Sequence, residues 1–283
     1  MPELPELEVI KKILSREIIG KEIEVPVFAK PYILKGIFPG YEKSFPSRIE
    51  KIERRGKFLL FHLKSGLLIV IHLMKSGRIR IVPEKGKIDK FTACYARLND
   101  GRQLDIVEYG KEKMAKIYFV RDTVNIPGFN NLGIDPFDPS FTEEYLKTQL
   151  FKERKKLKIF LKDQSMIAGI GNAYADEILW DAKLSPFKSS DLLSDSEIKN
   201  LFNSIIEVLR NSIKEIEKAA KGIFFKKEPR DFMKVHNKKG EPCRRCGSKI
   251  EWVYSKKNAI YYCPHCQTEG KVFKDRRLSK FLK

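Results

Sequence analysis

The sequence predicts an α+β protein with a β-rich first part, a helical second part and a small cysteine-containing end. Short segments rich in Val, Ile, Phe and Tyr fill residues 22–120, helical periodicity continues to about residue 221, and four of the five cysteines follow. The 283 residues are long for one domain. Hydrophobic residues make up 42 % of the chain, which is enough for a core and excludes a disordered chain.

The charge is strongly positive and unevenly spread. The chain carries 56 Lys and Arg against 37 Asp and Glu, a net charge of +19. Eleven of these charges lie between Lys226 and Lys283. Such a concentration predicts a polyanionic partner, most simply a nucleic acid.

No segment resembles a membrane span or a secretory leader. The longest apolar stretch, Gly66–Met74, is far shorter than the roughly 20 residues that cross a bilayer. The start of the chain is rich in proline and glutamate and lacks a basic patch followed by an apolar run. We therefore expect a cytoplasmic protein with no membrane partner.

The first segment has the spacing of a helix. Pro5 suits a first helical turn, and Gly20 is expected to end the helix. The apolar positions at helical spacing are Leu4, Leu7, Ile10, Ile13 and Leu14.

Eight short strands follow, which favours an antiparallel sandwich or barrel. Asn99-Asp-Gly101 and Lys64-Ser-Gly66 are good hairpin turns. The expected strands are Ile23–Phe28, Ser47–Ile52, Phe58–Leu63, Leu67–Leu73, Arg78–Val82, Phe91–Leu98, Gln103–Val107 and Ala115–Val120.

A linker and a helical region come next. Prolines, asparagines and a glycine in Asn130–Pro139 mark the linker. Ser194 with Glu197 predicts a capping box before a helix whose apolar face includes Leu201 and Ile205. A glycine-bracketed tight turn, Ala168–Asn172, separates the helices. The resulting boundaries are 1–131, a linker at 132–141, 142–225 and 226–283.

The cysteine spacing indicates a metal site. Cys243-Arg-Arg-Cys246 and Cys263-Pro-His-Cys266 are sixteen residues apart, which suits a structural zinc site of four thiolates. Disulfides are the weaker interpretation in a reducing cytosol. His265 is expected to face solvent, and Cys94 to act as a small buried hydrophobe.

Together these features resemble the formamidopyrimidine-DNA glycosylase family, which includes endonuclease VIII, over nearly the whole chain. The start of the chain is closer to the formamidopyrimidine branch. The resemblance implies an N-terminal β-sandwich, a helix–two-turns–helix domain and a C-terminal zinc ribbon. It is carried by Pro2–Glu8, Arg54–Leu59, His72–Gly77, Met166–Glu177, Lys239–Gly247 and Tyr261–Gln267.

The family's chemistry implies roles for particular residues. Its members flip a damaged base out of the duplex and cut the glycosidic bond. The nucleophile would be the amine of Pro2 after removal of Met1, forming an iminium ion from which β,δ-elimination cuts the strand. Glu3 would move protons, Glu6 would support the site, and Lys57 would contact the phosphate beside the lesion.

The resemblance also implies the partner and its contacts. The expected partner is double-stranded DNA with oxidised bases or abasic sites, bound by a monomer with one structural Zn²⁺. The glycine turn can present backbone N–H groups to a phosphate. The positions that match family DNA contacts are His72, Met74, Lys75, Lys158, Gly169, Gly171, Asn172, Lys257 and Asn258.

The sequence also departs from the family. Ile106–Ala115 stands where members carry an Asp-Pro-Arg-Arg-Phe-Gly segment that probes the opposite base. Lys75 occupies the place of a wedging methionine, and Asn258 that of an arginine on the ribbon. The stretch Gly222–Lys238 is short where members close a loop over 8-oxoguanine, and the basic tail Lys271–Lys283 is additional. We expect 8-oxoguanine opposite cytosine to be a poor substrate.

Two alternatives remain open at this point. A non-catalytic protein that binds damaged or branched DNA could retain the same scaffold, which the departures favour. A zinc-ribbon RNA-binding protein is the weaker alternative. Trapping of an iminium adduct, and competition between duplex DNA and RNA, would discriminate among these hypotheses.

Overall fold

The computed structural model describes residues 1–83, 88–110, 112, 114–123, 125–220, 224, 226–255 and 258–273, except the side chains of residues 255 and 258. The chain divides into two compact units. The first consists of Met1–Asn131 and Ile213–Pro229, and the second of Leu132–Ser212 and Arg230–Lys283. The ribbon, expected as a separate domain at 226–283, is thus grouped from Arg230 onward with the helical residues of the second unit. Among the helices described, none is both long and apolar enough to span a membrane.

Helix α1 (Leu4–Ile18) opens the first unit, as the apolar spacing predicts. Glu3 is its N-cap, Pro5 lies in the first turn, and Gly20 has a φ of +82° just beyond the last turn. The apolar side of α1, including Leu7, Ile10 and Leu14, joins the core between the sheets.

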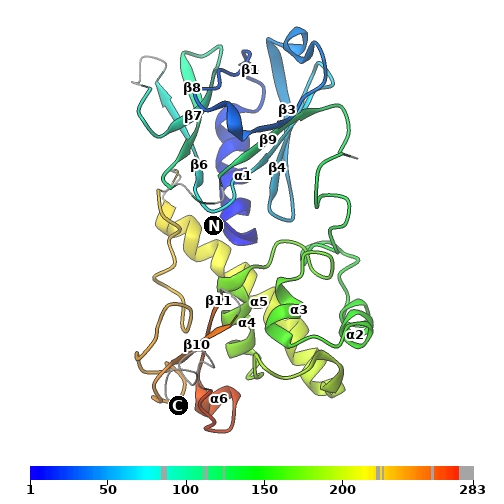
Figure 1. The fold of residues 1–283 in the computed structure, drawn as a ribbon, viewed down its shortest axis with the longest axis vertical. Helices are drawn as coiled ribbons and strands as arrows, with labels where there is room; N and C mark the ends of the chain where they lie inside the picture. The colour runs from blue at the N-terminus through cyan, green and yellow to red at the C-terminus, as the bar shows by residue number, and fades with distance from the viewer. Residues whose placement is uncertain are drawn as a thin grey trace, which may run out of the picture. The chain divides into compact units, whose positions relative to one another are not determined.

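The strands form two sheets, drawn as separate layers in Figure 1. The six-stranded sheet has the order β1-β3-β4-β5-β9-β2, and the three-stranded sheet the order β6-β8-β7. Both contribute apolar side chains to one core, which confirms the sandwich. The strands are β1 (Glu22–Ile23), β2 (Leu34–Gly36), β3 (Ser47–Arg55), β4 (Phe58–Leu63), β5 (Leu68–His72), β6 (Gly77–Pro83), β7 (Thr92–Arg97), β8 (Arg102–Glu108) and β9 (Lys116–Val120).

Two strand predictions are wrong. The strand expected at Ile23–Phe28 stops at Ile23, because Pro26 cannot donate a ladder hydrogen bond; only an isolated bridge joins Val27 to Tyr95. The sequence also did not predict β2, which pairs with β9 in parallel and makes the first sheet mixed. β2 has only three residues and ends in Gly36, so it shows no alternation of apolar and polar residues that could be detected in the sequence.

The second unit carries the helices and the cysteine ribbon (Figure 1). The predicted capping box starts α5: Ser194 N–H donates to Glu197 at 2.8 Å, and Glu197 N–H donates to Ser194 at 3.3 Å. The helices are α2 (Glu143–Lys152), α3 (Leu157–Lys162), α4 (Asn172–Asp181), α5 (Asp195–Ala220) and α6 (Pro264–Gln267). The hairpin β10 (Glu251–Ser255) and β11 (Asn258–Tyr262) lies between the two cysteine pairs.

Candidate functional site

The amino-terminal motif is folded into the first unit. Pro2 is buried, Glu3 is 3 % exposed and Glu6 is fully buried. Oε2 of Glu6 accepts the backbone N–H of Glu3 at 2.9 Å, as part of a capping box. Glu6 therefore fixes the backbone next to Pro2.

A half-buried carboxylate near the amino terminus was not predicted. The amino nitrogen of Met1 lies 3.2 Å from Oε1 of Glu228, which also lies 2.8 Å from the Arg78 guanidinium. Arg78 also donates to the carbonyl of Lys226 at 3.1 Å. No sequence signal could link Glu228 to the N-terminus, because 225 residues lie between Pro2 and Glu228 and no motif includes Glu228.

Lys57 lies in the turn between β3 and β4 and is only 8 % exposed, unlike a solvated hairpin lysine. Arg54 holds this turn by donating to the Gly56 carbonyl at 3.1 Å and to the Glu8 carboxylate at 2.9 Å. Since Glu8 belongs to α1, this ion pair joins the Lys57 turn to the helix that begins beside Pro2.

His72 is held in one neutral form. Burial, together with the charges of Lys57 and Lys116, lowers the pKa of His72 to about 4. Its Nδ1 accepts the Met74 N–H at 3.0 Å, so Nε2 carries the proton of the neutral ring. Phe58 packs edge-on against the ring. His72 can therefore donate a hydrogen bond to an anion without carrying a charge.

The turn after His72 is tight. Met74 has a φ of +51° and is half-buried, whereas Lys75 is exposed and pairs with Glu112 at 3.1 Å. At Gly77 a Cβ would lie 2.6 Å from the Leu73 carbonyl oxygen, so only glycine fits.

The segment Ile106–Ala115, which departs from the family pattern, contains a buried carboxylate that is hydrogen-bonded within the first unit. Glu108 is 3 % exposed, accepts the Ala115 N–H at 2.7 Å and accepts the Tyr32 hydroxyl at 2.8 Å. Burial and the Glu108 carboxylate raise the pKa of Tyr32 to about 12. Residues 111 and 113 of this segment lie outside the described residues.

In the second unit, Gln164 organises the glycine turn. Its side chain accepts the Gly169 N–H at 3.0 Å and donates to the Ile170 carbonyl at 2.7 Å. The expectation that Gly169 offers its N–H to a phosphate is therefore wrong, because that group already has a partner. Gly171 precedes α4 as its N-cap. No sequence motif selects Gln164, since its role depends on the folded turn.

Asn172 has an unsatisfied atom. Its Nδ2 donates to the Ala259 carbonyl of β11 at 3.2 Å. Its Oδ1 is buried and has no hydrogen-bond partner among the residues that the structure describes. A buried unsatisfied acceptor is unusual, and a ligand or water commonly explains it.

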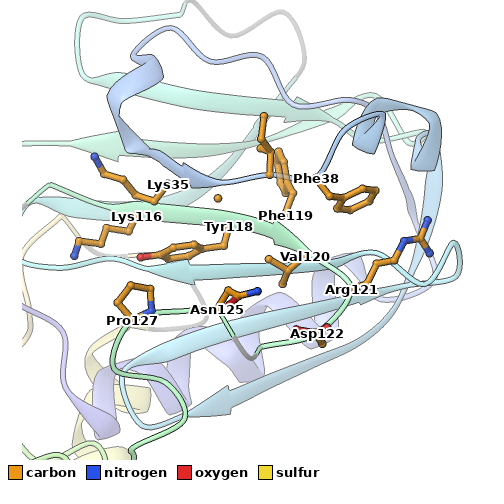
Figure 2. A pocket seen from close by; sticks show the side chains of 12 residues that line it. Lys35, Phe38, Lys116, Tyr118, Phe119, Val120, Arg121, Asp122, Asn125 and Pro127 are labelled. Carbon is orange, nitrogen blue, oxygen red and sulfur yellow. The ribbon is translucent and has the colours of Figure 1, made fainter.

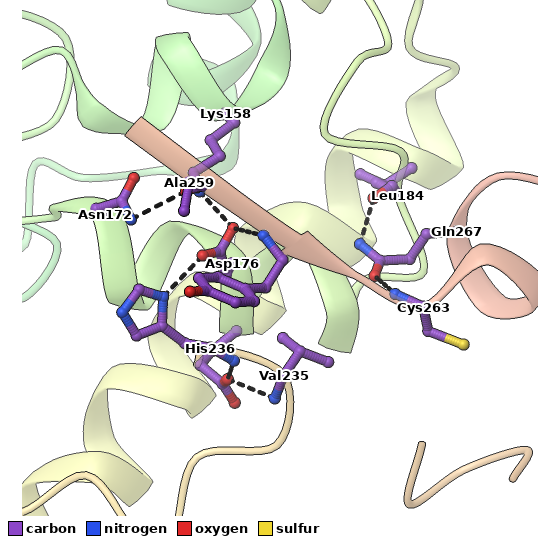
Figure 3. A network of polar contacts seen from close by, with 11 residues as sticks. Lys158, Asn172, Asp176, Leu184, Val235, His236, Ala259, Cys263 and Gln267 are labelled. Atoms are coloured by element: carbon purple, nitrogen blue, oxygen red, sulfur yellow. Dashed lines mark hydrogen bonds and ion pairs between the residues drawn. The ribbon is translucent and has the colours of Figure 1, made fainter. Parts of the chain in front are cut away.

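The structure corrects the expectation for Lys158. Its ammonium is 3 % exposed and donates to Asp176 Oδ1 at 2.5 Å and to the Ala259 carbonyl at 2.7 Å (Figure 3). Asp176 also binds Nδ1 of His236 at 2.8 Å and the Tyr261 N–H at 3.3 Å. Lys158 thus ties α3 and α4 to β11 and is not an exposed DNA contact.

Glu177 anchors the segment before the ribbon. Its carboxylate accepts the backbone N–H groups of Lys234, Val235 and His236 at 2.8–2.9 Å (the last two are drawn in Figure 3). Burial raises the pKa of Glu177, against the effect of these three donors. Asp176 and Glu177 together bind the ribbon region to α4.

The four clustered cysteines can hold a metal ion. Cys243, Cys246, Cys263 and Cys266 place their sulfurs within 4.8 Å of one another, and all are free of disulfides. Tetrahedral zinc thiolates with bonds of about 2.3 Å need sulfur separations of about 3.8 Å. The observed separations include 3.5 Å for Cys246–Cys263 and 4.0 Å for Cys243–Cys266. Hydrogen bonds from Ser248 lower the pKa of Cys246 to about 6, which favours a thiolate.

Two predicted contact residues are not placed. Lys257 lies outside the described residues, and so does the side chain of Asn258, although its backbone begins β11. The tail from residue 274 onward is also outside them. Cys94 is buried and His265 is exposed, as expected.

Known families match both units. Residues 1–109 match the formamidopyrimidine-DNA glycosylase N-terminal domain, and residues 132–223 match the formamidopyrimidine-DNA glycosylase H2TH domain. The formamidopyrimidine-DNA glycosylase of Desulforamulus reducens is 33 % identical, covering 94 % of this chain and 99 % of that protein. The enzyme of the same name from Herpetosiphon aurantiacus is 32 % identical, covering 94 % and 100 %.

Solved structures agree with these relatives. The Lactococcus lactis Fpg in complex with DNA containing an abasic site superposes with a TM-score of 0.84 at 29 % identity, covering 94 % of this chain and 99 % of that one. A MutM complex with DNA containing carbocyclic 8-oxo-G also gives 0.84 at 29 % identity, covering 94 % and 100 %. Matches in sequence and fold along nearly the whole chain confirm the resemblance seen in its motifs: the chain belongs to the formamidopyrimidine-DNA glycosylase family.

Proposed function

We propose that this protein is a bifunctional DNA glycosylase and AP lyase that removes oxidised bases from duplex DNA through the amine of Pro2. The observation that carries the proposal is the buried Pro2–Glu3 pair at the start of α1, with Glu6 fixing the Glu3 backbone. An acidic side chain next to a potential amine nucleophile is the combination that this chemistry needs.

The reaction follows from the chemistry of that amine. Once Met1 is removed, Pro2 is a secondary amine, and the positive end of the α1 dipole disfavours its ammonium form. The amine attacks C1′ of the sugar, the damaged base leaves, and a Pro2 iminium remains. Glu3 protonates the opening sugar and later moves the proton lost from C2′. The iminium accepts the electrons of that C–H bond, so β- and then δ-elimination expel the strand phosphates.

Other residues are suited to hold the DNA backbone. In the first unit, Lys57 offers a poorly solvated ammonium, and His72 offers a neutral Nε2–H donor. In the second unit, Asn172 lies at the N-terminus of α4 and has a second Nδ2 proton to donate, whereas its unsatisfied buried Oδ1 can only accept and does not suit a phosphate. The net charge of +19 would supply sequence-independent attraction to duplex DNA. The Lactococcus lactis relative was solved with abasic-site DNA, which supports this partner.

We propose zinc as the metal of the four-cysteine site. Four thiolates at these separations suit Zn²⁺, and a site without an open position would be structural. The metal would stabilise the β10–β11 hairpin, whose Ala259 carbonyl is bound by Lys158 and Asn172.

The departures from the family define the proposed substrate range. The Glu108 carboxylate, in the segment that stands in place of the one probing the opposite base, already accepts hydrogen bonds from Tyr32 and Ala115. Lys75 stands where family members have the wedging methionine. Abasic sites, formamidopyrimidines and oxidised pyrimidines should therefore be processed better than 8-oxoguanine opposite cytosine.

Borohydride trapping tests the mechanism. Wild-type protein with its N-terminal Met removed should form a covalent adduct on a duplex with an abasic site. Glu3→Gln should reduce base release on a matched duplex with an oxidised pyrimidine by at least a hundredfold. A form with an uncleaved N-terminal extension should give no adduct, because its Pro2 nitrogen is an amide.

Pro5→Ala is the matched control, since it removes the other proline of the motif and leaves the amine intact. It should trap like the wild type. If the protein with a free Pro2 binds the duplex but forms no adduct, the enzyme proposal fails, and the non-catalytic damaged-DNA-binding protein is the better description.

A further inference from the structure

The first unit contains a pocket away from the amino terminus, at the edge where β2 pairs with β9 (Figure 2). Its volume is about 700 Å³, within the range of small-molecule sites. The lining comes from β2, β9 and the segments that follow them. Neither the amino-terminal motif nor the cysteine site contributes to it.

Three cations, Lys35, Lys116 and Arg121, line this pocket together with one carboxylate, that of Asp122. Among the described residues, the side chains of Lys35 and Lys116 take part in no hydrogen bond or ion pair. Arg121 lies on the opposite side of the pocket in Figure 2, with its guanidinium 5.0 Å from the centre of the Phe38 ring. Three cations against one carboxylate around a concavity favour an anionic ligand.

An aromatic ring forms the floor between these cations. Tyr118 is 5 % exposed, and the backbone of Gly36 lies against its ring. A Cβ at position 36 would approach Cδ1 of Tyr118 to 3.0 Å, so glycine lets β2 pack closely here. The Tyr118 hydroxyl has no partner in the part of the chain that the structure describes, and in Figure 2 it points toward the side of Lys116. The pocket thus presents only a small exposed part of this ring, with a hydrogen-bonding group at one end.

We propose that this pocket is a second nucleotide-binding site, which takes a base against the half-buried Phe38 and the exposed part of Tyr118, and the attached phosphate at Lys35 and Lys116. An aromatic ring suits the face of a base, and a base–aromatic contact is sequence-tolerant. Ammonium groups suit a phosphate. The ligand is therefore a nucleoside monophosphate unit, either free or within a single-stranded stretch of DNA.

The two lysines join this pocket to the rest of the first sheet. Lys116 is directly opposite His72 in the β5–β9 pairing, and its charge contributes to lowering the pKa of His72. A phosphate bound at Lys116 would lie on the strand next to the one that carries His72. The proposal nevertheless requires neither the Pro2 reaction nor a damaged base, so it can be tested without turnover.

Calorimetric titration of the full chain at low ionic strength tests the site. The three probes are 5′-dAMP, deoxyadenosine and inorganic phosphate. We expect 5′-dAMP to bind at least tenfold more tightly than either part, since base and phosphate contacts act together. A deoxyadenosine trinucleotide as a fourth probe distinguishes a single-strand site, which should bind it more tightly than the mononucleotide.

Variants locate the binding. Lys35→Ala/Lys116→Ala should weaken 5′-dAMP binding by tenfold or more. Lys43→Ala/Lys64→Ala removes the same charge from the same unit outside the pocket and should leave the affinity within about twofold of the wild type. Gly36→Ala should also weaken binding, because the new Cβ displaces the Tyr118 ring.

The outcomes are separable from those of the trapping assay. The proposal would be overturned if inorganic phosphate bound with the same affinity as 5′-dAMP. It would also be overturned if Lys35→Ala/Lys116→Ala and Lys43→Ala/Lys64→Ala lost the same affinity for 5′-dAMP. A protein that traps abasic DNA but does not bind 5′-dAMP contradicts only the pocket. A protein that binds 5′-dAMP through Lys35 and Lys116 but forms no adduct contradicts only the proposed function.

Discussion

The ammonium of Lys158 lies 2.5 Å from Oδ1 of Asp176, and both side chains are almost completely excluded from solvent. The same carboxylate binds His236 and the backbone of Tyr261, while Lys158 also binds the Ala259 carbonyl. This charge pair, with Lys158 on α3 and Asp176 on α4, thereby helps to fix the position of the β10–β11 hairpin, which lies between the two cysteine pairs in the chain.

Removing one member of this pair should be costly. Lys158→Met leaves the Asp176 carboxylate buried without its cation and should lower the free energy of unfolding by about 3 kcal/mol. Urea denaturation measures the change. The double variant Lys158→Met/Asp176→Asn should recover part of the loss, since no buried charge then remains unpaired.

Lys155→Met is the control for that experiment. Lys155 pairs with Asp163 at 2.9 Å, but both side chains are about one third exposed. Its removal should cost less than about 1 kcal/mol. Equal losses for Lys155→Met and Lys158→Met would show that burial does not govern the energetics of the Lys158 pair.

The stability of the first unit should depend on pH through His72. The folded protein binds a proton at His72 only near pH 4, because its pKa is lowered to about 4, whereas the unfolded chain does so near the ordinary histidine pKa of 6.5. Between these values the unfolded state holds more protons, so stability falls as the pH drops from about 6.5 to about 4. Melting temperatures across this range should fall less steeply for His72→Gln.

An NMR titration provides the direct check of that prediction. The imidazole resonances of His72 should move with a midpoint near 4 in the folded protein. A midpoint near the ordinary histidine value would contradict the burial of the ring next to Lys57.

Metal removal should be visible in tryptophan fluorescence. The Trp180 Nε1–H donates to the Cys243 sulfur at 3.3 Å, whereas Trp252 is partly exposed on β10. A strong chelator should release about one zinc ion per chain and change the emission of Trp180. Metal analysis and fluorescence on the same sample test both expectations.

Substitutions show which tryptophan gives the change in fluorescence on chelation. Trp252→Phe should retain the chelator response, and Trp180→Phe should lose it. Cys94→Ser removes the cysteine outside the cluster and should leave the zinc content unchanged, whereas Cys246→Ser should reduce it. An unchanged metal content in Cys246→Ser would rule out the four-thiolate site.

Gly133→Ala should disrupt the start of the second unit. A Cβ there would lie 2.3 Å from the Met166 carbonyl oxygen and 2.7 Å from that of Ser165, and backbone atoms cannot yield easily. We expect a loss of about 3 kcal/mol in unfolding free energy. Gly101→Ala, with no atom within 4 Å but a φ of +76°, should cost only about 1 kcal/mol. Equal costs would contradict the close approach.

Local patterns in the sequence determined most of the fold. Apolar spacing located α1, alternating apolar runs located seven of the nine strands in β1–β9 well, and the Ser194–Glu197 box located the start of α5. These features depend on neighbours a few residues apart. β2 escaped prediction because a three-residue strand has no period of its own and exists only by pairing with β9.

The residues of the candidate site also fall into two groups, those that sequence motifs identify and those that only the fold brings together. The sequence by itself determined the four cysteines that can hold a metal ion, the Pro2–Glu3–Glu6 motif and the family, because these are short motifs of fixed spacing. Only the tertiary structure decided that Lys158 is buried on Asp176, that Gln164 occupies the Gly169 N–H, and that Glu228 lies beside the amino terminus. A side chain's exposure, pKa and partners depend on groups that the fold brings from distant positions, and no local pattern encodes those distances.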